Sequence, residues 1–253
     1  MAVAGQPVGT VADATGHFRL ALPASVAEAD TLQVALLGYA PRTWTVRELL
    51  SQPAGLPLRV QLAERPALLP AATVRAARLK QERIGNHHYK TTLQTNFALG
   101  AEPGQNVGSE IGRVFQLPRG GAWLDRFRFV VCGNTFDTVR LRINVYRLRD
   151  GVPREPLLAE PLYRDVIGKR ATWVDVDLQP LNLFVDAGEV VVAVEWVGHS
   201  RKGDSLGMPL LMPAFATHLY RYGAASRWKR FPGMSTCMEL TVTQSGREAG
   251  GGE

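Results

Sequence analysis

Two carboxylates at alternate positions, Asp175 and Asp177, are of the residue type that performs acid–base chemistry. Paired carboxylates act as general acid and base when they face each other across a cleft. Residues two apart in an extended segment instead share one strand face, about 7 Å apart. Such a pair is typical of solvation, or of a cross-strand charge ladder with Arg140 and Arg142. We therefore predict no catalytic residue in this segment.

The adjacent histidines His87 and His88 are the best candidates for metal ligands. Neighbouring side chains on an extended segment point in opposite directions, so a single site cannot readily use both. Glu82 and His17 are the available third ligands, and their spacing does not favour either of them. We interpret the two histidines as a solvent-exposed pair in a linker, and we predict no metal and no cofactor.

Residues 108–112 place a serine and a glutamate between glycines. A nucleophile elbow needs its serine centred between glycines on a strand-to-helix turn, whereas Ser109 follows Gly108 directly and no helical pattern comes after it. The segment therefore predicts a turn. We expect Glu110 to be structural, accepting backbone N–H groups at the start of a strand. With no zinc-peptidase motif in the chain, the sequence predicts a protein that is not an enzyme.

Aromatic residues offer a different chemistry, since sugars stack on exposed rings while nearby polar side chains fix their hydroxyl groups. Tyr146 and Trp173 lie on the polar faces of their expected strands. Arg142 and Asp175 accompany them on those faces. We predict that these four residues form a ligand-binding face, for either a glycan or a protein partner.

The elements that position these residues are strands. Residues 139–147 alternate aliphatic side chains with Arg140, Arg142, Asn144 and Tyr146, and residues 173–178 alternate in the same way. Residues 189–197 are almost continuously apolar, which is typical of a strand covered on both faces. Asp150 and Gly151 supply a turn. The first half predicts a turn at residues 13–16, one helical turn at 46–50, and short strands at 17–22, 31–37, 42–46, 56–62 and 71–76.

Composition limits the class of protein further. The chain has 253 residues, a net charge of +6 and arginines spread along its whole length, without a basic block, so we predict no nucleic-acid binding. No apolar run reaches the roughly 18 residues of a membrane-spanning helix, and residues 1–7 do not resemble a signal peptide. Cys132 and Cys237 could form one disulfide or remain two free thiols.

The first third of the chain resembles a known family. The hairpin at residues 9–18, with the letters G-T-V-A-D-A-T-G-H-F, the strand Leu32 to Leu36 and the pair Gly38-Tyr39 are similar to the carboxypeptidase-like regulatory domain. Ala12 stands where Thr or Ser is usual. The resemblance covers residues 1 to about 76 and implies a transthyretin-like β-sandwich. It also implies that further strands, and a possible signal peptide, precede residue 1.

The second half is similar to a module that often follows this domain in envelope proteins of Gram-negative bacteria. The similarity rests on short segments with the following residues: Gly85-Asn86, 108–112, 142–146, 150–153 and 173–178. The resemblance implies a location in the periplasm, in the outer membrane or at the cell surface. It implies an accessory role and no particular reaction.

Together these observations predict an all-β fold, a partial transthyretin-like β-sandwich followed by a jelly-roll-like antiparallel β-sandwich. The expected boundaries are residues 1–77 for the first domain, 78–106 for a linker, 107–244 for the second domain and 245–253 for a disordered tail. We expect a non-catalytic binding or scaffolding protein of the cell envelope, with an envelope protein or a glycan as partner. The alternative is a carbohydrate-binding jelly-roll module.

Overall fold

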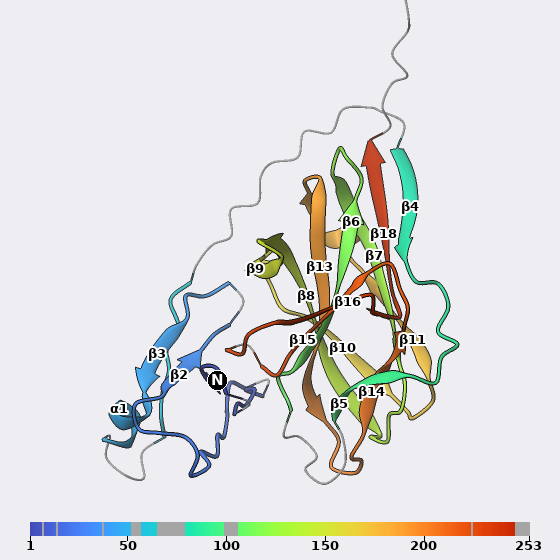
Figure 1. Cartoon of the computed structure of the whole chain (residues 1–253). Coiled ribbons are helices and arrows are strands. Elements are labelled where there is room, and N and C mark those ends of the chain that lie inside the picture. The colour runs from blue at the N-terminus through green and yellow to red at the C-terminus, as the bar shows by residue number, and fades with distance from the viewer. Residues whose placement is uncertain are drawn as a thin grey trace, which may run out of the picture.

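The computed structural model describes residues 1–6, 8–13, 15–36, 38–51, 57–64, 79–98, 106–223 and 225–245. The described chain is nearly all β, arranged as antiparallel sheets, which confirms the predicted fold class (Figure 1). A small N-terminal module lies beside a large β-sandwich. The transthyretin-like identity of the module stays a prediction. None of the helices in the described residues is long and apolar enough to cross a membrane.

The described residues of the N-terminal module form one three-stranded sheet in the order β1-β2-β3 and a single helical turn. Its elements are β1 (Ala2–Val3), β2 (Thr31–Val34), β3 (Arg42–Thr45) and α1 (Val46–Leu50). Helix α1 begins with a capping box, in which Thr45 and Glu48 satisfy each other's backbone N–H groups. The short core of the module consists of Val3, Leu32 and Val46.

The larger sheet of the sandwich has the strand order β10-β8-β13-β6-β15-β16, and β9 pairs with β8. Its strands are β6 (Glu110–Leu117), β8 (Thr138–Arg149), β9 (Val152–Pro156), β10 (Leu162–Ile167), β13 (Gly188–His199), β15 (Thr217–Arg221) and β16 (Lys229–Pro232). Both faces of β13 are covered, since each side chain from Val190 to Val194 is fully buried. The continuous apolar run predicted this placement.

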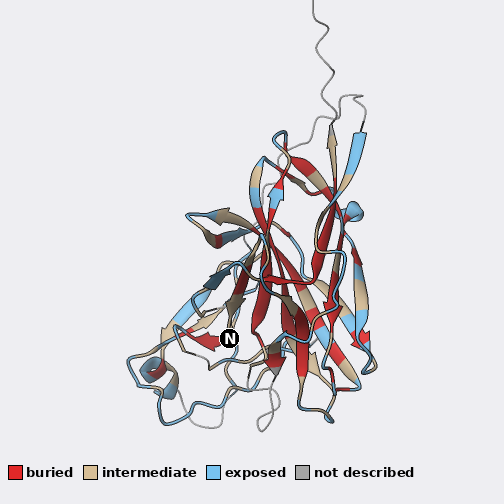
Figure 2. Ribbon diagram, turned by 45° about the vertical axis from the view of Figure 1, so that its right-hand side comes forward, coloured by how far each residue is buried: buried red, intermediate tan, exposed pale blue. Residues whose placement is uncertain are grey.

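The second sheet has the order β11-β7-β18-β4, and β12 pairs with β7. Its strands are β4 (Leu79–Gly85), β7 (Ala122–Val131), β11 (Thr172–Asp177), β12 (Phe184–Val185) and β18 (Met238–Ser245). The 3-10 helix η1 (Gln179–Leu181) lies between β11 and β12. A further sheet, β17-β14-β5, contains β5 (Gln94–Ala98), β14 (Leu206–Leu211) and β17 (Ser235–Thr236). The apolar faces of these sheets meet in one core, which Figure 2 shows as buried strands through the centre of the sandwich.

The structure corrects two predictions about these elements. The expected linker over residues 78–106 is wrong for β4 and β5, because β4 pairs with β18 and β5 pairs with β14. The expected strand over residues 17–22 is absent. The turn before it is present, because the Asp13 carboxylate accepts the N–H groups of Thr15 and His17, at 2.9 Å each. Without a neighbouring strand to pair with, alternation alone does not form a strand here.

Other predictions are confirmed or lie outside the described residues. Asp150 and Gly151 both have positive φ at the turn between β8 and β9, as a tight hairpin turn requires. Residues 57–62 are described and form no strand, whereas the predicted strand at 71–76 and the tail after residue 245 lie outside the described residues. Cys132 and Cys237 are free thiols. Burial raises the pKa of the Cys237 thiol to about 11.

Candidate functional site

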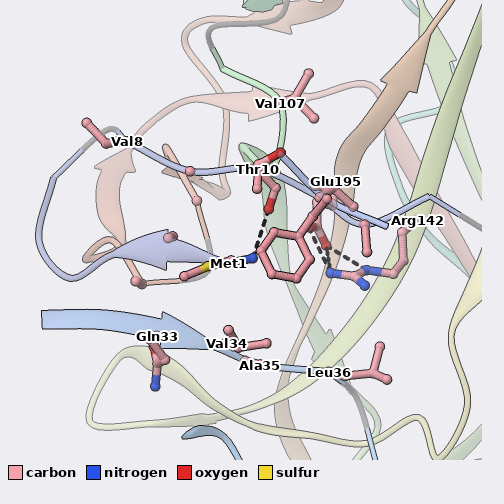
Figure 3. Close-up of a pocket in the computed structure, with 18 of the residues that line it drawn as sticks. Met1, Val8, Thr10, Gln33, Val34, Ala35, Leu36, Val107, Arg142 and Glu195 are labelled. Atoms are coloured by element: carbon pink, nitrogen blue, oxygen red, sulfur yellow. Dashed lines mark hydrogen bonds and ion pairs between the residues drawn. The ribbon is translucent and has the colours of Figure 1, made fainter. Parts of the chain in front are cut away.

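A cavity of about 350 Å³ lies between the N-terminal module and the outer face of the larger sheet (Figure 3). The module contributes the backbone around Thr10 and the end of β2 near Ala35, and the sandwich contributes Arg142, Glu195 and Tyr163. The two regions also contact each other directly. Gly5 N donates to Ala225 O at 3.2 Å, and Ser226 Oγ donates to Gln6 O at 3.3 Å.

The floor of this cavity contains a buried ion pair on the outer face of β8 and β13. Arg142 donates from Nε and Nη2 to the Glu195 carboxylate, at 2.7 and 2.8 Å, and Asn144 donates to the same carboxylate at 2.9 Å. Glu195 is only 2% exposed. Burial alone lowers the pKa of Arg142, but the Glu195 carboxylate more than offsets this and raises it above its ordinary value. Burial also raises the pKa of the Glu195 carboxyl, and Arg142 and the Asn144 hydrogen bond oppose that rise. Arg142 and Glu195 together carry no net charge.

A second ion pair lies beside the first, on β6 and β15. Glu110 is 1% exposed and accepts hydrogen bonds from Arg221 Nε at 2.9 Å, from Arg221 Nη2 and from the Tyr146 hydroxyl at 3.0 Å. The guanidinium of Arg221 also lies over the Trp228 ring at 4.6 Å. Side chains, and not the backbone N–H groups expected from the sequence, thus satisfy Glu110.

The two pairs belong to one row across the sheet, which we call the charge row: Arg142, Glu195, Glu110 and Arg221. Glu195 is the cross-strand partner of both Arg142 and Glu110, and Glu110 is also the partner of Arg221. The signs alternate as plus, minus, minus, plus, so each carboxylate has its own guanidinium. A buried charge row of this kind stays folded only because every member is paired.

The structure separates the four residues predicted to form one binding face. Arg142 lines the cavity, but Tyr146 is only 9% exposed, lies edge-on to Trp228, and has a pKa raised well above its ordinary value, chiefly by burial. Trp173 and Asp175 belong to β11 in the other sheet. The predicted common face is therefore wrong, because alternation along a strand does not show which sheet that strand joins.

Trp173 and Asp175 form a separate surface cluster with Arg128 and Tyr89. Arg128 pairs with Asp175 at 2.8 Å and lies over the Trp173 ring at 4.7 Å, and Tyr89 contacts that ring edge-on at 6.0 Å. The ladder predicted between Asp175 and Arg140 or Arg142 is wrong, since β11 pairs with β7 and not with β8. Beside the cluster, the outer face of this sheet has a polar hollow of about 300 Å³.

His87 contacts a buried carboxylate. Its Nδ1 lies 2.5 Å from the carboxylate of Glu239, which is 2% exposed. Within the described part of the chain, no three His, Cys, Asp or Glu side chains gather as metal ligands would. Glu195 and Arg221 were missed by the sequence analysis. A single glutamate inside the apolar run of residues 190–197 is the signal that could have identified Glu195.

Comparison with known proteins gives little support for a family assignment. No known family matches the sequence, and no curated protein matches it. One similar solved structure is that of the cysteine protease and lectin-like domains of Cwp84, a surface layer associated protein of Clostridium difficile, with a TM-score of 0.41 and 9% identity. The match covers 55% of this chain and 32% of that one. A likeness at this level carries no argument about function.

Proposed function

We propose that the chain is a non-catalytic binding or scaffolding protein of the cell envelope that holds its partner in the cavity between the two regions. The observation that carries this proposal is the cavity itself, which combines a floor of neutralised charge with walls from two modules. Cavities of about 300–1,000 Å³ at the junction of domains are common ligand sites. The cavity of about 350 Å³ falls in that range.

The charge row supports binding over catalysis. A general acid or base must be able to exchange a proton with a bound substrate. The Glu195 carboxylate instead receives three hydrogen bonds from Arg142 and Asn144, and Glu110 receives its own from Arg221 and Tyr146. These carboxylates connect neighbouring strands of the larger sheet. A ligand in the cavity meets a rigid, electrically balanced surface.

The envelope location and the transthyretin-like identity of residues 1–77 rest on the sequence resemblance. The contacts of Gly5 and Gln6 with residues 225 and 226 support a module that docks on the sandwich as an accessory unit. Fractionation of the organism that makes the protein tests the location. Recovery in the envelope fraction is expected, and recovery in the cytoplasm alone would overturn the envelope part of the proposal.

Filling the cavity tests the binding role. Ala35 is exposed and lines the cavity, so Ala35→Trp places a bulky ring in it without removing a core contact. Ala29 is also exposed but does not line the cavity, so Ala29→Trp is the matched control. We expect the unaltered chain and Ala29→Trp to sediment with isolated envelopes, and Ala35→Trp to bind at least about tenfold more weakly. Equal binding by all three would contradict the proposal.

Carbohydrate binding is the second candidate, and the cluster of Trp173, Tyr89, Arg128 and Asp175 favours it. An aromatic pair beside a polar hollow is the arrangement on which sugars stack and hydrogen-bond. A glycan array with Trp173→Ala distinguishes the two candidates, with Phe231→Ala as a control on another exposed ring. Loss of glycan binding in Trp173→Ala alone supports the second candidate. Glycan binding that depends on Ala35 supports the first cavity instead.

A further inference from the structure

Arg113 on β6 is a buried cation without an anion. Its side chain points toward the sandwich interior, as do those of Ile111 and Phe115 two residues away on the same strand, and it is 7% exposed. Nη1 donates to Asn86 Oδ1 at 2.5 Å and to Met238 O at 3.1 Å, while Nε has no hydrogen-bond partner. Within the described part of the chain, no carboxylate pairs with it.

The guanidinium is charged at neutral pH in spite of this burial. Removal from water lowers the pKa of Arg113 to about 10, which is still well above 7. Proteins rarely leave a charge buried without a partner, because the loss of hydration is not recovered. The paired position on β15, His218, is also buried, and its Nδ1 has no partner. Buried polar groups with incomplete hydrogen bonding thus gather around Arg113.

Arg113 lines a second cavity, of about 520 Å³, that opens at the edge of β6. Strand β15 pairs with β6 only as far as Arg113, so no strand among the described residues pairs with residues 114–117 on that side. The walls come from β4, β6, the start of β13 and the segment that leads into β15. They include Ile84, Phe115, Gln116, Glu189, Phe215 and Thr217. Phe215 is fully exposed at the rim.

We propose that this cavity binds a monoanionic sugar acid, with the ligand carboxylate paired to Arg113 and the sugar ring against Phe215. A planar carboxylate matches the fork of N–H groups on a guanidinium. An exposed aromatic ring suits the apolar face of a sugar, and Gln116 and Thr217 offer hydrogen bonds to hydroxyl groups. The site differs from the cavity between the two regions, so it extends the proposed function to a second ligand.

The charge of the site selects a monoanion over a phosphate. Among the described residues that line the cavity, Arg113 is the one arginine, and Glu189 lines it as well. A doubly charged ligand would therefore meet an unfavourable potential. Nε of Arg113 has no contact with solvent in this structure. Binding therefore requires the guanidinium to turn from Asn86 toward the cavity.

Titration calorimetry of the full chain with glucuronate, glucose and acetate tests the proposal. We expect glucuronate to bind at least about tenfold more tightly than either other probe, because glucose lacks the carboxylate and acetate lacks the ring. Arg113→Met should abolish this preference, and Phe215→Ala should weaken glucuronate binding. Ile167→Ala, which removes an apolar side chain 83% exposed on β10, is the matched control and should leave it unchanged.

Two outcomes would overturn the proposal: no binding of glucuronate by the unaltered chain, or equal binding by the unaltered chain and Arg113→Met. If Arg113→Met does not fold, Arg113→Lys keeps the charge without the planar fork and should weaken binding. The variant Ala35→Trp should bind glucuronate normally. The glucuronate experiment thus tests the Arg113 site separately from binding in the cavity between the two regions.

Discussion

The sandwich and the N-terminal module differ most in how much apolar surface each buries. The sandwich has one continuous core drawn from the sheets around it, in which Phe127, Phe129 and Trp196 are fully buried. The described core of the module consists of Val3, Leu32 and Val46, packed against a few half-buried neighbours. Because stability scales with the apolar area removed from water, we expect the sandwich to fold by itself and the module to depend on its contacts with the sandwich.

The ion pairs of the two regions also differ in burial, and the more buried pairs lie in the sandwich. The sandwich buries the charge row in its larger sheet, where each carboxylate has its own arginine, and Arg142 and Glu195 also line the cavity beside the module. In the module, the pair Arg47 and Glu28 is largely exposed. Buried pairs are sensitive to the loss of one member, whereas exposed pairs contribute little. The comparison therefore separates a rigid framework from an attached unit, and each prediction below tests that separation.

The largest expected effect comes from the two cores. Phe129→Ala should lower the free energy of unfolding of the whole chain by about 3–5 kcal/mol, because it leaves a large cavity in the shared core. Leu32→Ala should speed hydrogen exchange in β1, β2 and β3 and leave the exchange of β7 and β13 unchanged. Hydrogen exchange followed by mass spectrometry measures both. Faster exchange of β13 in Leu32→Ala would show that the two regions unfold as one unit.

The charge row should give the next largest effect. Glu195→Ala leaves Arg142 buried without its carboxylate, and we expect a loss of about 3–5 kcal/mol in the free energy of urea unfolding. The double variant Arg142→Met with Glu195→Leu should recover most of that loss, because no charge remains buried. Glu28→Ala in the module is the matched control and should change stability by less than about 1 kcal/mol. Similar losses in both single variants would contradict the distinction between the regions.

His218 makes the stability of the sandwich dependent on pH. Burial lowers its pKa from 6.5 to about 4, so between these values the unfolded chain binds a proton that the folded chain does not. The contribution of neutral His218 to the free energy of unfolding is fully present above pH 6.5 and is lost as the pH falls toward 4. At pH 4.5 the free energy of unfolding is lower by about 2 kcal/mol. His218→Gln should flatten this dependence in urea unfolding curves at pH 7 and 4.5. The histidine of the module, His17, is exposed and provides the control as His17→Gln.

The sequence was sufficient for those parts of the fold that depend on local pattern. Alternation predicted β8, the continuous apolar run predicted β13, and Asp150 with Gly151 predicted the turn after β8. Strand β4 was mistaken for a linker because four consecutive residues, 80–83, are polar or charged. It lies at the edge of its sheet, where exposed charged side chains are normal and protect against pairing with other chains.

The candidate sites depended on information that alternation does not contain. Alternation correctly placed Arg142 and Tyr146 on the outer face of β8. It did not show what covers that face or which strands lie beside β8. The charge row arises from cross-strand register among β8, β13, β6 and β15, which are far apart in the sequence. Arg113 occupies an inward position on β6 where an apolar residue is normal. A charged residue at such a position is a pattern that could have predicted Arg113 as a candidate site residue.

The smallest expected effect tests whether exposed charges distinguish the regions at all. Asp175 and Arg128 form a half-exposed pair at 2.8 Å on the sandwich, and Glu28 and Arg47 form an exposed pair at 3.1 Å in the module. Because water screens both, a double-mutant cycle at each should give a coupling of about 0.2–1 kcal/mol that 1 M salt largely removes. Equal values would show that the regions differ in their buried groups and not in their surfaces. A coupling well above this range at Asp175 would mean that the aromatic cluster with Trp173 holds the pair rigidly, as a preformed binding site requires.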